Sequence, residues 1–352
     1  MDSNIDNKPA KDEQIKQLLR PLADLLEQPE INELTINCPG EAWIKTKQGW
    51  SYREIPELTE NYLHSLATAM IVYNELQPKS IVSVLLPSGE RGQIIMPPAC
   101  INGTISLSIR KHSMVVKTLE QLKEEGIFDN FTDVSFNKPS SEEAANYLTK
   151  QDFTRLESFE VDLLNLKSQG KIQEFLEQAV LSKRNIIITG KTGSGKTTFG
   201  RSLIKKIPLD ERIITIEDVH ELFLEDHPNK VHMLYGENAG RVTASDCLES
   251  CMRQSPDRIL LAELRGNEAW EYLTSLNTGH PGTITTTHSN NALQTFERIA
   301  TLIKNSDVGG QLDIEMIKKV LYTTIDVVLF LNKFKLVEIF YDPIFAKAKL
   351  MV

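Results

Sequence analysis

A glycine-rich stretch, GKTGSGKT at residues 190–197, holds the residues best suited to chemistry in this chain. It matches the pattern G-x-x-x-x-G-K-[S/T], which forms a phosphate-binding loop when a strand precedes it and a helix follows it. Both conditions are expected here, because residues 186–189 form a short apolar run and residues 198–206 have helical spacing. The sequence therefore predicts a site for the phosphates of a nucleotide.

The residue types in this loop each have a physical role. Gly193 and Gly195 allow the backbone to curl so that its N–H groups point at phosphate oxygens, and the following helix adds its positive N-terminus. We expect Lys196 to reach the β- and γ-phosphates and the hydroxyl of Thr197 to bind Mg²⁺. The sequence thus predicts a nucleoside triphosphate and Mg²⁺ as ligands; we expect ATP, although the loop by itself fits GTP as well. The expected nucleotide-binding residues are Gly190, Thr192, Gly193, Ser194, Gly195, Lys196, Thr197 and Thr198.

Acidic residues at two strand ends are the candidates for hydrolysis. Glu217 follows the apolar run 213–216, and Glu263 follows the run 259–262. An extra strand between the phosphate loop and the acidic strand is typical of RecA-like ATPases, in which a glutamate polarises the attacking water. We expect Glu263 to be the general base, facing the γ-phosphate from the strand beside the loop. Glu217 is assigned to Mg²⁺ or to a Mg²⁺-bound water.

A histidine completes the set of catalytic candidates. His288 leaves the end of the run 283–286, at the same edge of the predicted sheet. From there its ring can hydrogen-bond the γ-phosphate or the attacking water. His280, which precedes this run, is interpreted as part of the turn that leads into it.

These side chains need a rigid sheet to position them, and the pattern of apolar runs predicts one. The four runs just described are apolar on both faces, which suits parallel strands covered by helices on each side. Ligands gather at the carboxyl ends of such strands. We therefore predict an α/β fold, with a RecA-like ATPase domain of parallel strands over residues 171–352.

The chain before residue 171 is expected to form two further parts. Residues 1–112 indicate a smaller α+β N-terminal domain, with helical spacing at 11–27 and 61–76 and strand-like runs at 31–37, 42–47, 81–86, 93–96 and 104–110. Residues 113–170 hold two amphipathic pieces around a polar break and are interpreted as a partly helical interdomain linker.

The overall composition excludes several classes of protein. The 39 basic and 48 acidic residues give a net charge of −9, which disfavours a protein that coats nucleic-acid phosphates. No segment approaches the ~20 apolar residues of a membrane span, and the first residues lack a signal-peptide core, so we expect a cytoplasmic location. The four cysteines include no C-x-x-C pair, so a structural zinc site built on cysteines is not expected.

Four segments carry a resemblance to a known family: KTGSGKTT (191–198), IEDVHEL (216–222), DRILLAELRG (257–266) and TGHPGTITTTH (278–288). They resemble the nucleotide motifs of the bacterial secretion ATPases, and most closely those of the type IV secretion traffic ATPases, the eleventh protein of the VirB set. Residues 86–111, 226–235 and 327–343 also resemble this family. The resemblance extends over most of residues 20–345.

The resemblance implies a hexameric ring that hydrolyses ATP at the cytoplasmic face of the inner membrane, where it is peripherally associated. It also implies work on substrate export or pilus assembly, as in conjugation, together with other inner-membrane ATPases and channel components. Two N-domain arginines of the family reach the nucleotide, and they match Arg91 and Arg110. Arginine suits this role because it stays charged and binds phosphate with a planar fork.

Two features depart from the family pattern, and other functions remain open at this point. Relatives carry a basic residue where this chain has Ser255, and residues 113–170 are long compared with the shorter members.

One alternative is a type II secretion or type IV pilus motor ATPase, although these commonly carry a four-cysteine zinc module. Others are a RecA-type nucleic-acid motor, which the acidic balance disfavours, and a non-enzymatic scaffold. No direct sequence-specific binding of nucleic acid is expected.

Overall fold

The computed structural model describes residues 8–46, 48–111, 116–236 and 242–350, and it contains two compact units. Of the described residues, those up to 111 belong to the first unit, and 116–236 and 242–350 form the second. Each unit has its own apolar core. The units are therefore described one at a time.

The first unit is an antiparallel sheet with helices packed against one face. Its strands are ordered β3-β2-β1-β6-β5-β4. The alternation of buried and exposed residues along β1, β2, β5 and β6 places one apolar row on the side of the core. The elements are α1 (Lys8–Leu18), α2 (Ala23–Glu27), α3 (Glu60–Tyr73), β1 (Glu33–Ile36), β2 (Glu41–Thr46), β3 (Gly49–Glu54), β4 (Ile81–Leu85), β5 (Arg91–Ile95) and β6 (Ser106–Arg110).

Two details of this unit differ from the expectation. The predicted helix over residues 11–27 is broken by the 3₁₀ turn Arg20–Leu22, because Pro21 lacks an N–H group and its ring obstructs the preceding turn. The edge strand β3 was not predicted. It is mostly exposed: Trp50 and Tyr52 alternate with Ser51 and Arg53, but both aromatic side chains lie outside the core.

The second unit is built on a largely parallel sheet. Its two ladders, β10-β9-β11 and β12-β8-β13-β14-β7, are joined by a parallel bridge between Glu263 and Thr286. All pairs are parallel except that of β13 and β14, which form a hairpin. The strands are β7 (Thr132–Asp133), β8 (Ile186–Gly190), β9 (Ile213–Glu217), β10 (Lys230–Leu234), β11 (Arg258–Leu261), β12 (Ile284–Thr287), β13 (Val327–Asn332) and β14 (Lys335–Tyr341).

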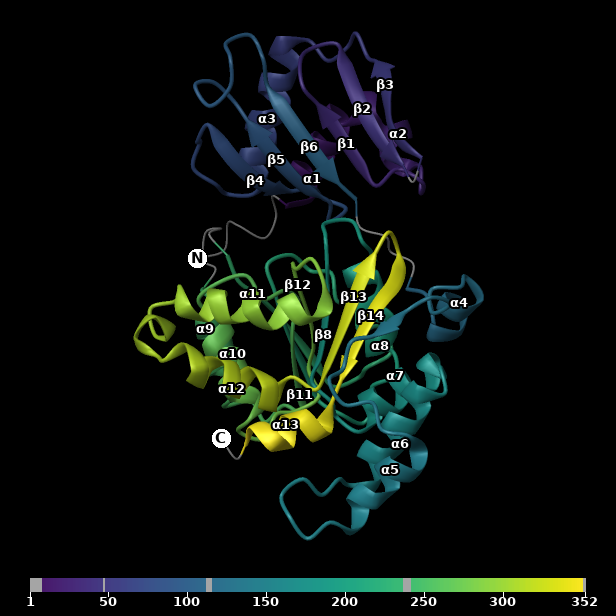
Figure 1. Ribbon diagram of the computed structural model, residues 1–352. Coiled ribbons are helices and arrows are strands. Elements are labelled where there is room, and N and C mark those ends of the chain that lie inside the picture. Colours follow the sequence, from purple (N-terminus) through teal and green to yellow (C-terminus); the bar gives the residue numbers. More distant parts are fainter. Residues whose placement is uncertain (1–7, 47, 112–115, 237–241, 351–352) are drawn as a thin grey trace. The chain divides into compact units, whose positions relative to one another are not determined.

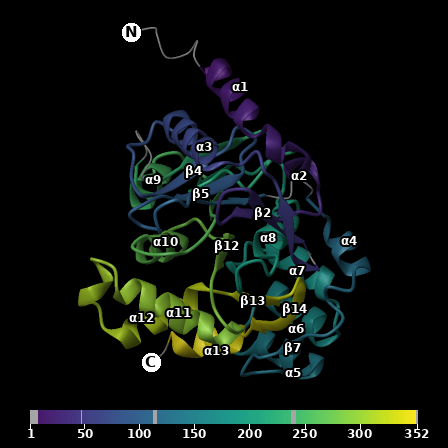
Figure 2. The same cartoon turned by 90° about the horizontal axis from the view of Figure 1, so that it is seen from above.

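Helices cover both faces of this sheet, as the apolar runs predicted. In β8, Ile186 and Ile188 pack into one core and Ile187 packs into the other. Figures 1 and 2 show α11 and α12 on one side of β13, and α6 and α7 on the other. The described helices of this unit are α4 (Leu119–Glu124), α5 (Ser141–Asn146), α6 (Ser158–Ser168), α7 (Ile172–Leu181), α8 (Lys196–Ile204), α9 (Ala244–Cys251), α10 (Ala269–Leu276), α11 (Ala292–Lys304), α12 (Ile314–Thr324) and α13 (Pro343–Lys349).

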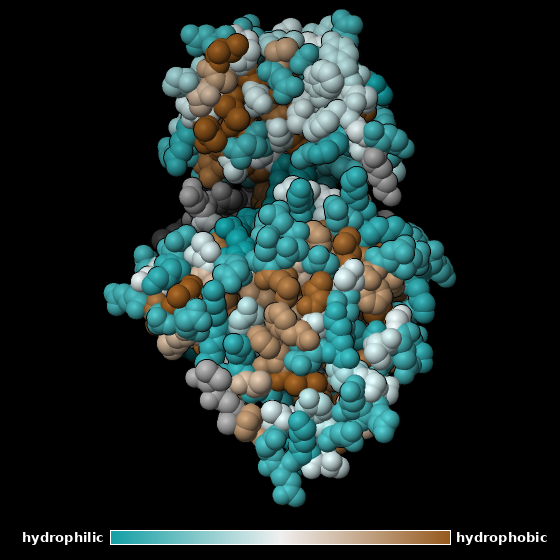
Figure 3. Space-filling model, viewed as in Figure 1, coloured by the Kyte–Doolittle hydropathy of each residue, from teal (hydrophilic) through white to brown (hydrophobic). Residues whose placement is uncertain are grey.

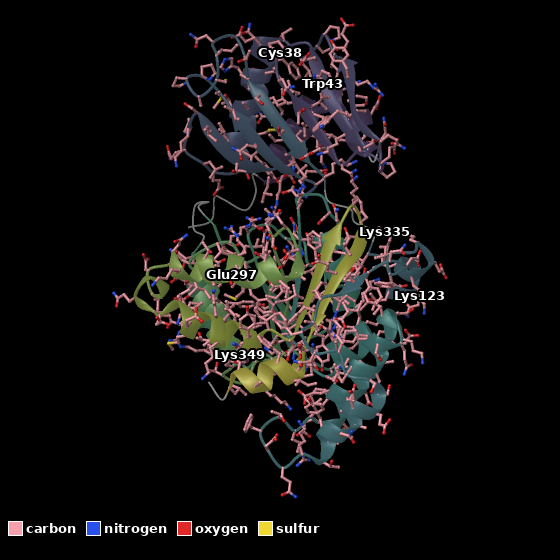
Figure 4. The ribbon with its side chains drawn as sticks, viewed as in Figure 1. Cys38, Trp43, Lys123, Glu297, Lys335 and Lys349 are labelled. Carbon is pink, nitrogen blue, oxygen red and sulfur yellow. The ribbon has the colours of Figure 1, made fainter. Side chains whose placement is uncertain are left out.

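Residues 116–170, interpreted above as a linker, pack as part of the second unit. Leu119, Leu156 and Leu163 are fully buried in the same core as the P-loop strand β8. The short strand β7 adds to the sheet beside β14. Figure 4 shows Lys335 of β14 close to α4, and its Nζ donates to the carbonyls of Glu125 and Gly126 at 2.9 and 2.6 Å. These residues therefore brace the ATPase fold.

The surface of the second unit is mixed. On the face seen in Figure 3, polar side chains cover most of the rim and apolar side chains gather near the middle. Among the described helices, none has the length and the apolar character needed to cross a membrane.

Candidate nucleotide-binding site

The phosphate loop lies between the end of β8 and the start of α8, as the motif predicts. Gly193 and Gly195 have φ angles of 74° and 96°, in the left-handed region that favours glycine. A Cβ atom on Gly195 would lie 2.8 Å from the ring of Phe334, at the tip of the β13–β14 hairpin. The backbone N–H of Phe334 also donates to the carbonyl of Ser194 at 3.1 Å. The hairpin tip therefore holds the loop, a contact that the motif alone does not indicate.

Lys196 begins α8 and turns its side chain back into the loop. Its Nζ donates to the carbonyls of Gly190 at 2.9 Å and Lys191 at 3.2 Å, and lies 3.3 Å from Nδ1 of His288. The residue is only 7% exposed. The cation is thus held at the mouth of the loop, where the oxygens of a polyphosphate would bind.

The remaining loop residues fit a phosphate group. Thr192 and Gly193 are exposed at the turn, and Thr197 and Thr198 are half-buried in the first turn of α8. The hydroxyl of Ser194 is buried and has no hydrogen-bond partner among the described residues. Buried hydroxyls normally have a partner, so this donor suits an anion bound inside the curl. Free N–H groups in the first turn of a helix suit the same anion.

The strand order corrects one expectation about Glu263. We expected its strand to lie beside the phosphate loop, but β12 lies between β8 and β11. The residue that follows β12 is His288, and it therefore lies closest to the loop. Its Nε2 lies 3.0 Å from Oε1 of Glu263, and its Nδ1 faces Lys196. The ring thus connects the lysine of the loop with the candidate base.

The protonation of His288 follows from these neighbours. Burial lowers the pKa of its imidazole, and the positive charge of Lys196 lowers it further. The ring is therefore neutral at pH 7. We assign the proton to Nε2, because Nε2–H then donates to the carboxylate of Glu263 and Nδ1 accepts from Lys196. Nδ1 also lies 3.2 Å from the carbonyl of Gly190, to which it makes no hydrogen bond in this tautomer.

Sequence reasoning missed Arg265, which stands two residues after the candidate base. One of its terminal nitrogens lies 2.9 Å from Oε2 of Glu263, and the other lies 2.5 Å from Oδ2 of Asp218. Burial alone would lower the pKa of Arg265, but the carboxylates of Glu263 and Asp218 raise it above its usual value. The guanidinium therefore stays charged and holds the carboxylate of Glu263 in place. A basic residue directly after an acidic strand end is the signal that could have indicated it.

Glu217 is placed differently from the other candidates. It is fully buried, and it ends β9, which β11 and β12 separate from the loop strand. Its Oε2 accepts the backbone N–H groups of Glu221 and Leu222, both at 2.7 Å. Its Oε1 accepts the hydroxyl of Thr215 at 2.6 Å and lies 3.3 Å from Nδ1 of both His220 and His232.

These contacts decide the charge of Glu217. Burial alone would raise the pKa of its carboxyl, but hydrogen bonds from the two histidines, from Thr215 and from the backbone outweigh burial and hold the pKa well below its usual range. Glu217 is thus a fixed anion within its own segment. It connects to the loop through the next residue, Asp218, which pairs with Arg265.

Arg91 and Arg110 lie in the first unit, on neighbouring strands. They are directly opposite each other in the β5–β6 ladder, and Glu33 of β1 is opposite Arg110 on its other side. Like charges directly opposite in a sheet repel each other. The two guanidinium groups and the carboxylate of Glu33 therefore share one end of the sheet.

Comparison with known families agrees with the site. The family model described as "Type II/IV secretion system protein" matches residues 152–331. This span contains the phosphate loop, Glu217, Glu263 and His288.

Individual proteins match over nearly the whole chain. The type IV secretion system protein VirB11 of Brucella suis is 41% identical over 340 residues, which cover 92% of this chain and 89% of that protein. The crystal structure of the VirB11 ATPase from the Brucella suis type IV secretion system, in complex with sulphate, superposes with a TM-score of 0.53. It is 38% identical and covers 98% of this chain and 99% of that chain.

A more distant structure shows the same fold. The Legionella pneumophila ATPase DotB matches with a TM-score of 0.54 and 16% identity, over 96% of this chain and 86% of that chain.

Proposed function

Because this chain belongs to the VirB11 family of type IV secretion system proteins, we propose that it is a hexameric, Mg²⁺-dependent ATPase that powers or switches substrate transport and pilus assembly in such a system. The chain is a RecA-like ATPase of this family. The 41% identity to VirB11 of Brucella suis extends over 92% of this chain. This similarity favours a type IV secretion ATPase over a type II secretion or pilus motor and over a nucleic-acid motor.

One observation carries the catalytic part of the proposal. Three side chains lie in a row at the carboxyl ends of β8, β12 and β11. Nζ of Lys196 lies 3.3 Å from Nδ1 of His288, and Nε2 of His288 lies 3.0 Å from Oε1 of Glu263. A phosphate-binding cation, a neutral hydrogen-bonding ring and a carboxylate base thus lie in one row. A scaffold that only binds nucleotide does not need the base.

Binding of ATP uses the loop. The curled backbone and the first turn of α8 donate N–H groups to the phosphates, and Lys196 leaves the carbonyls of its own loop to meet the β- and γ-phosphate oxygens. Ser194 donates its buried hydroxyl. Thr197 would hold Mg²⁺, and Glu217 would act on it through bound water. When bound, Mg²⁺ neutralises charge on the β- and γ-phosphates.

Hydrolysis then depends on Glu263. Its carboxylate accepts a proton from a water molecule, the water oxygen bonds to the γ-phosphorus, and the bond from that phosphorus to the oxygen bridging the β- and γ-phosphates breaks to release ADP. His288 orients the water or the γ-phosphate through Nε2–H, which leaves Oε1 of Glu263 to do so. Arg265 keeps the carboxylate pointed at the water by its hydrogen bond to Oε2.

The first unit senses the nucleotide. The cationic pair Arg91 and Arg110 meets the γ-phosphate, so that the triphosphate binds the closed arrangement of a ring better than the diphosphate does. The ring is a homo-hexamer, associated peripherally with the cytoplasmic face of the inner membrane. Its partners are other inner-membrane ATPases and channel components of the same secretion system.

The experiment that tests this function compares purified wild-type protein with Glu263→Gln. Both should bind an ATP analogue, but the variant should hydrolyse ATP at least ~100-fold more slowly, because a positioned general base contributes ~10²–10⁴-fold. Wild-type turnover by the variant would remove Glu263 from the role of base. Sedimentation with and without ATP analogue tests the ring, and a monomer at micromolar concentration with analogue would contradict it.

A further inference from the structure

Two histidines and the buried carboxylate of Glu217 converge on one point beside the ATPase site. His220 lies in the loop after β9 and His232 lies on β10, twelve residues further along the chain. Ligand atoms of His220, His232 and Glu217 all lie within 4.8 Å of one another. This is a donor set of two imidazoles and one carboxylate, which the proposed hydrolysis does not use as a group.

The distances are compatible with metal ligands as well as with the hydrogen bonds described above, and Nδ1 of His232 also lies 2.8 Å from Oγ1 of Thr215. Nδ1 of His220 and Nδ1 of His232 each lie 3.3 Å from the same oxygen, Oε1 of Glu217. An N–H···O hydrogen bond is usually about 2.9–3.0 Å long. Two ligands of a tetrahedral ion with bonds of about 2.0–2.1 Å are separated by about 3.3–3.4 Å, which is the edge of the tetrahedron.

The surroundings hold the carboxylate in the required direction. Oε2 of Glu217 accepts hydrogen bonds from the backbone N–H groups of Glu221 and Leu222. These bonds fix that oxygen and leave Oε1 directed at the two histidines. The hydroxyl of Thr215 lies 2.6 Å from Oε1 and supplies the outer hydrogen bond that ligating carboxylates usually have. Metal ligands are oriented by such contacts as much as by their own rotamers.

The two rings are placed to share one ion. Their centroids are 4.4 Å apart and the planes are inclined by 67°, so the nitrogens approach a common point without stacking. The side chain of Glu217 is buried, whereas those of His220 and His232 are 40% and 24% exposed. Solvent can therefore supply a fourth ligand, as at sites with three protein ligands and an open position.

We propose that Glu217, His220 and His232 form a site for one borderline divalent transition-metal ion of the Zn²⁺ type, bound through Oε1 and the two Nδ1 atoms. Imidazole ligands select such ions over Mg²⁺, which prefers oxygen ligands. The site goes beyond the proposed ATPase function, because it requires both histidines and no nucleotide. It also engages the carboxylate that the proposed function assigns to Mg²⁺-bound water.

Co²⁺ is the probe for the site, because it replaces Zn²⁺ and has intense visible absorption in tetrahedral geometry. The full-length protein, treated with chelator and free of nucleotide and Mg²⁺, is titrated with Co²⁺ and then with Zn²⁺. We expect visible bands that saturate at one ion per chain and disappear when Zn²⁺ displaces Co²⁺. No such bands in the wild type would overturn the proposal.

Variants identify the ligands. His220→Ala and His232→Ala should each lower Zn²⁺ affinity by at least about 100-fold, since even outer contacts contribute 10–100-fold. His64→Ala, at an exposed position of α3 in the first unit, is the matched control and should bind as the wild type. Thermal unfolding without metal checks that both ligand variants are folded. Zn²⁺ should raise the melting temperature of the wild type and of the control, but not of the two ligand variants.

Two results would overturn the assignment. Wild-type Zn²⁺ affinity in both ligand variants would show that the histidines serve only as hydrogen-bond partners of Glu217. Near-ultraviolet bands of a cobalt thiolate would place the ion at a cysteine; Cys38 and Cys100 are partly exposed, and Cys247 and Cys251 are buried on α9. Because these readouts involve no ATP, failure of the metal site leaves the proposed ATPase function unaffected.

Discussion

Nε2 of His288 lies 3.0 Å from Oε1 of Glu263, on the side of the ring opposite to Lys196. The histidine therefore lies between the cation that binds phosphate and the carboxylate proposed as base. This position results from the strand order, which places β12 between β8 and β11.

His288→Ala should lower kcat by about 10–100-fold and change ATP affinity little. The ring orients the reacting groups through one hydrogen bond, and losing a hydrogen bond to a charged group costs about 1.5–3 kcal/mol. Steady-state turnover together with analogue binding separates the two effects. The control is His64→Ala, because His64 is exposed, whereas the ring of His227 is buried. Unchanged kcat would remove His288 from the reaction.

Hydrolysis should decline in acid only below pH 6.5, the ordinary pKa of histidine. Burial and the charge of Lys196 lower the pKa of His288, so the neutral ring persists to lower pH than usual. As pH falls through the lowered pKa, the ring gains a proton, loses its acceptor at Nδ1 and pairs with the base Glu263. A pH–rate profile of kcat checks this. A decline that begins above pH 7 would contradict the neutral ring.

Lys196→Ala should abolish hydrolysis and weaken ATP binding by about 10–100-fold. The variant lacks the cation whose side chain turns back into the loop, and a charge-assisted hydrogen bond contributes about 1.5–3 kcal/mol. Lys191→Ala is the matched control, because its exposed side chain lies in the same loop. Fluorescent-nucleotide binding and phosphate release measure both effects. Full turnover by Lys196→Ala would exclude this loop as the nucleotide site.

Arg110→Ala should weaken binding of a non-hydrolysable ATP analogue and leave ADP affinity nearly unchanged, because only the triphosphate carries the charge that it meets. Arg91→Ala should act in the same direction. Arg53→Ala, an exposed arginine of β3 in the same unit, is the control. Calorimetric titration with both nucleotides provides the measurement. Equal losses for both would indicate contact with shared phosphates or a structural role.

Lys167→Met should destabilise the second unit by about 3–5 kcal/mol, because it leaves a partly buried carboxylate without its partner. Nζ of Lys167 lies 2.8 Å from Oδ2 of Asp133, and it also donates to Ser135 and to the carbonyl of Tyr341. Urea unfolding measures the loss. Lys171→Met, at an exposed position nearby, should change stability by less than about 0.5 kcal/mol. Equal stability of Lys167→Met and wild type would mean that this segment does not brace the fold.

Local pattern was enough to predict the phosphate loop and the RecA-like class. Gly193, Gly195 and Lys196 act within eight consecutive residues, so their spacing alone defines the curl and the cation. The runs that became β8, β9, β11 and β12 likewise predicted parallel strands, and each of these strands is buried on both faces, although three of the four residues of β12 are threonines. The roles of Glu217, Glu263 and His288 remain predictions that the variants above test.

Contacts between distant residues were decided only by the tertiary structure. The strands of this sheet have similar sequence patterns, so the pattern does not predict which strands are neighbours. The sequence therefore does not reveal that β12 separates β11 from β8 and brings His288 to Lys196. Tertiary packing likewise decided that Arg265 contacts Asp218. It also decided that residues 116–170 pack into the core of the second unit. Neighbour order depends on how whole faces pack against helices, which is a property of the assembled cores and not of any local period.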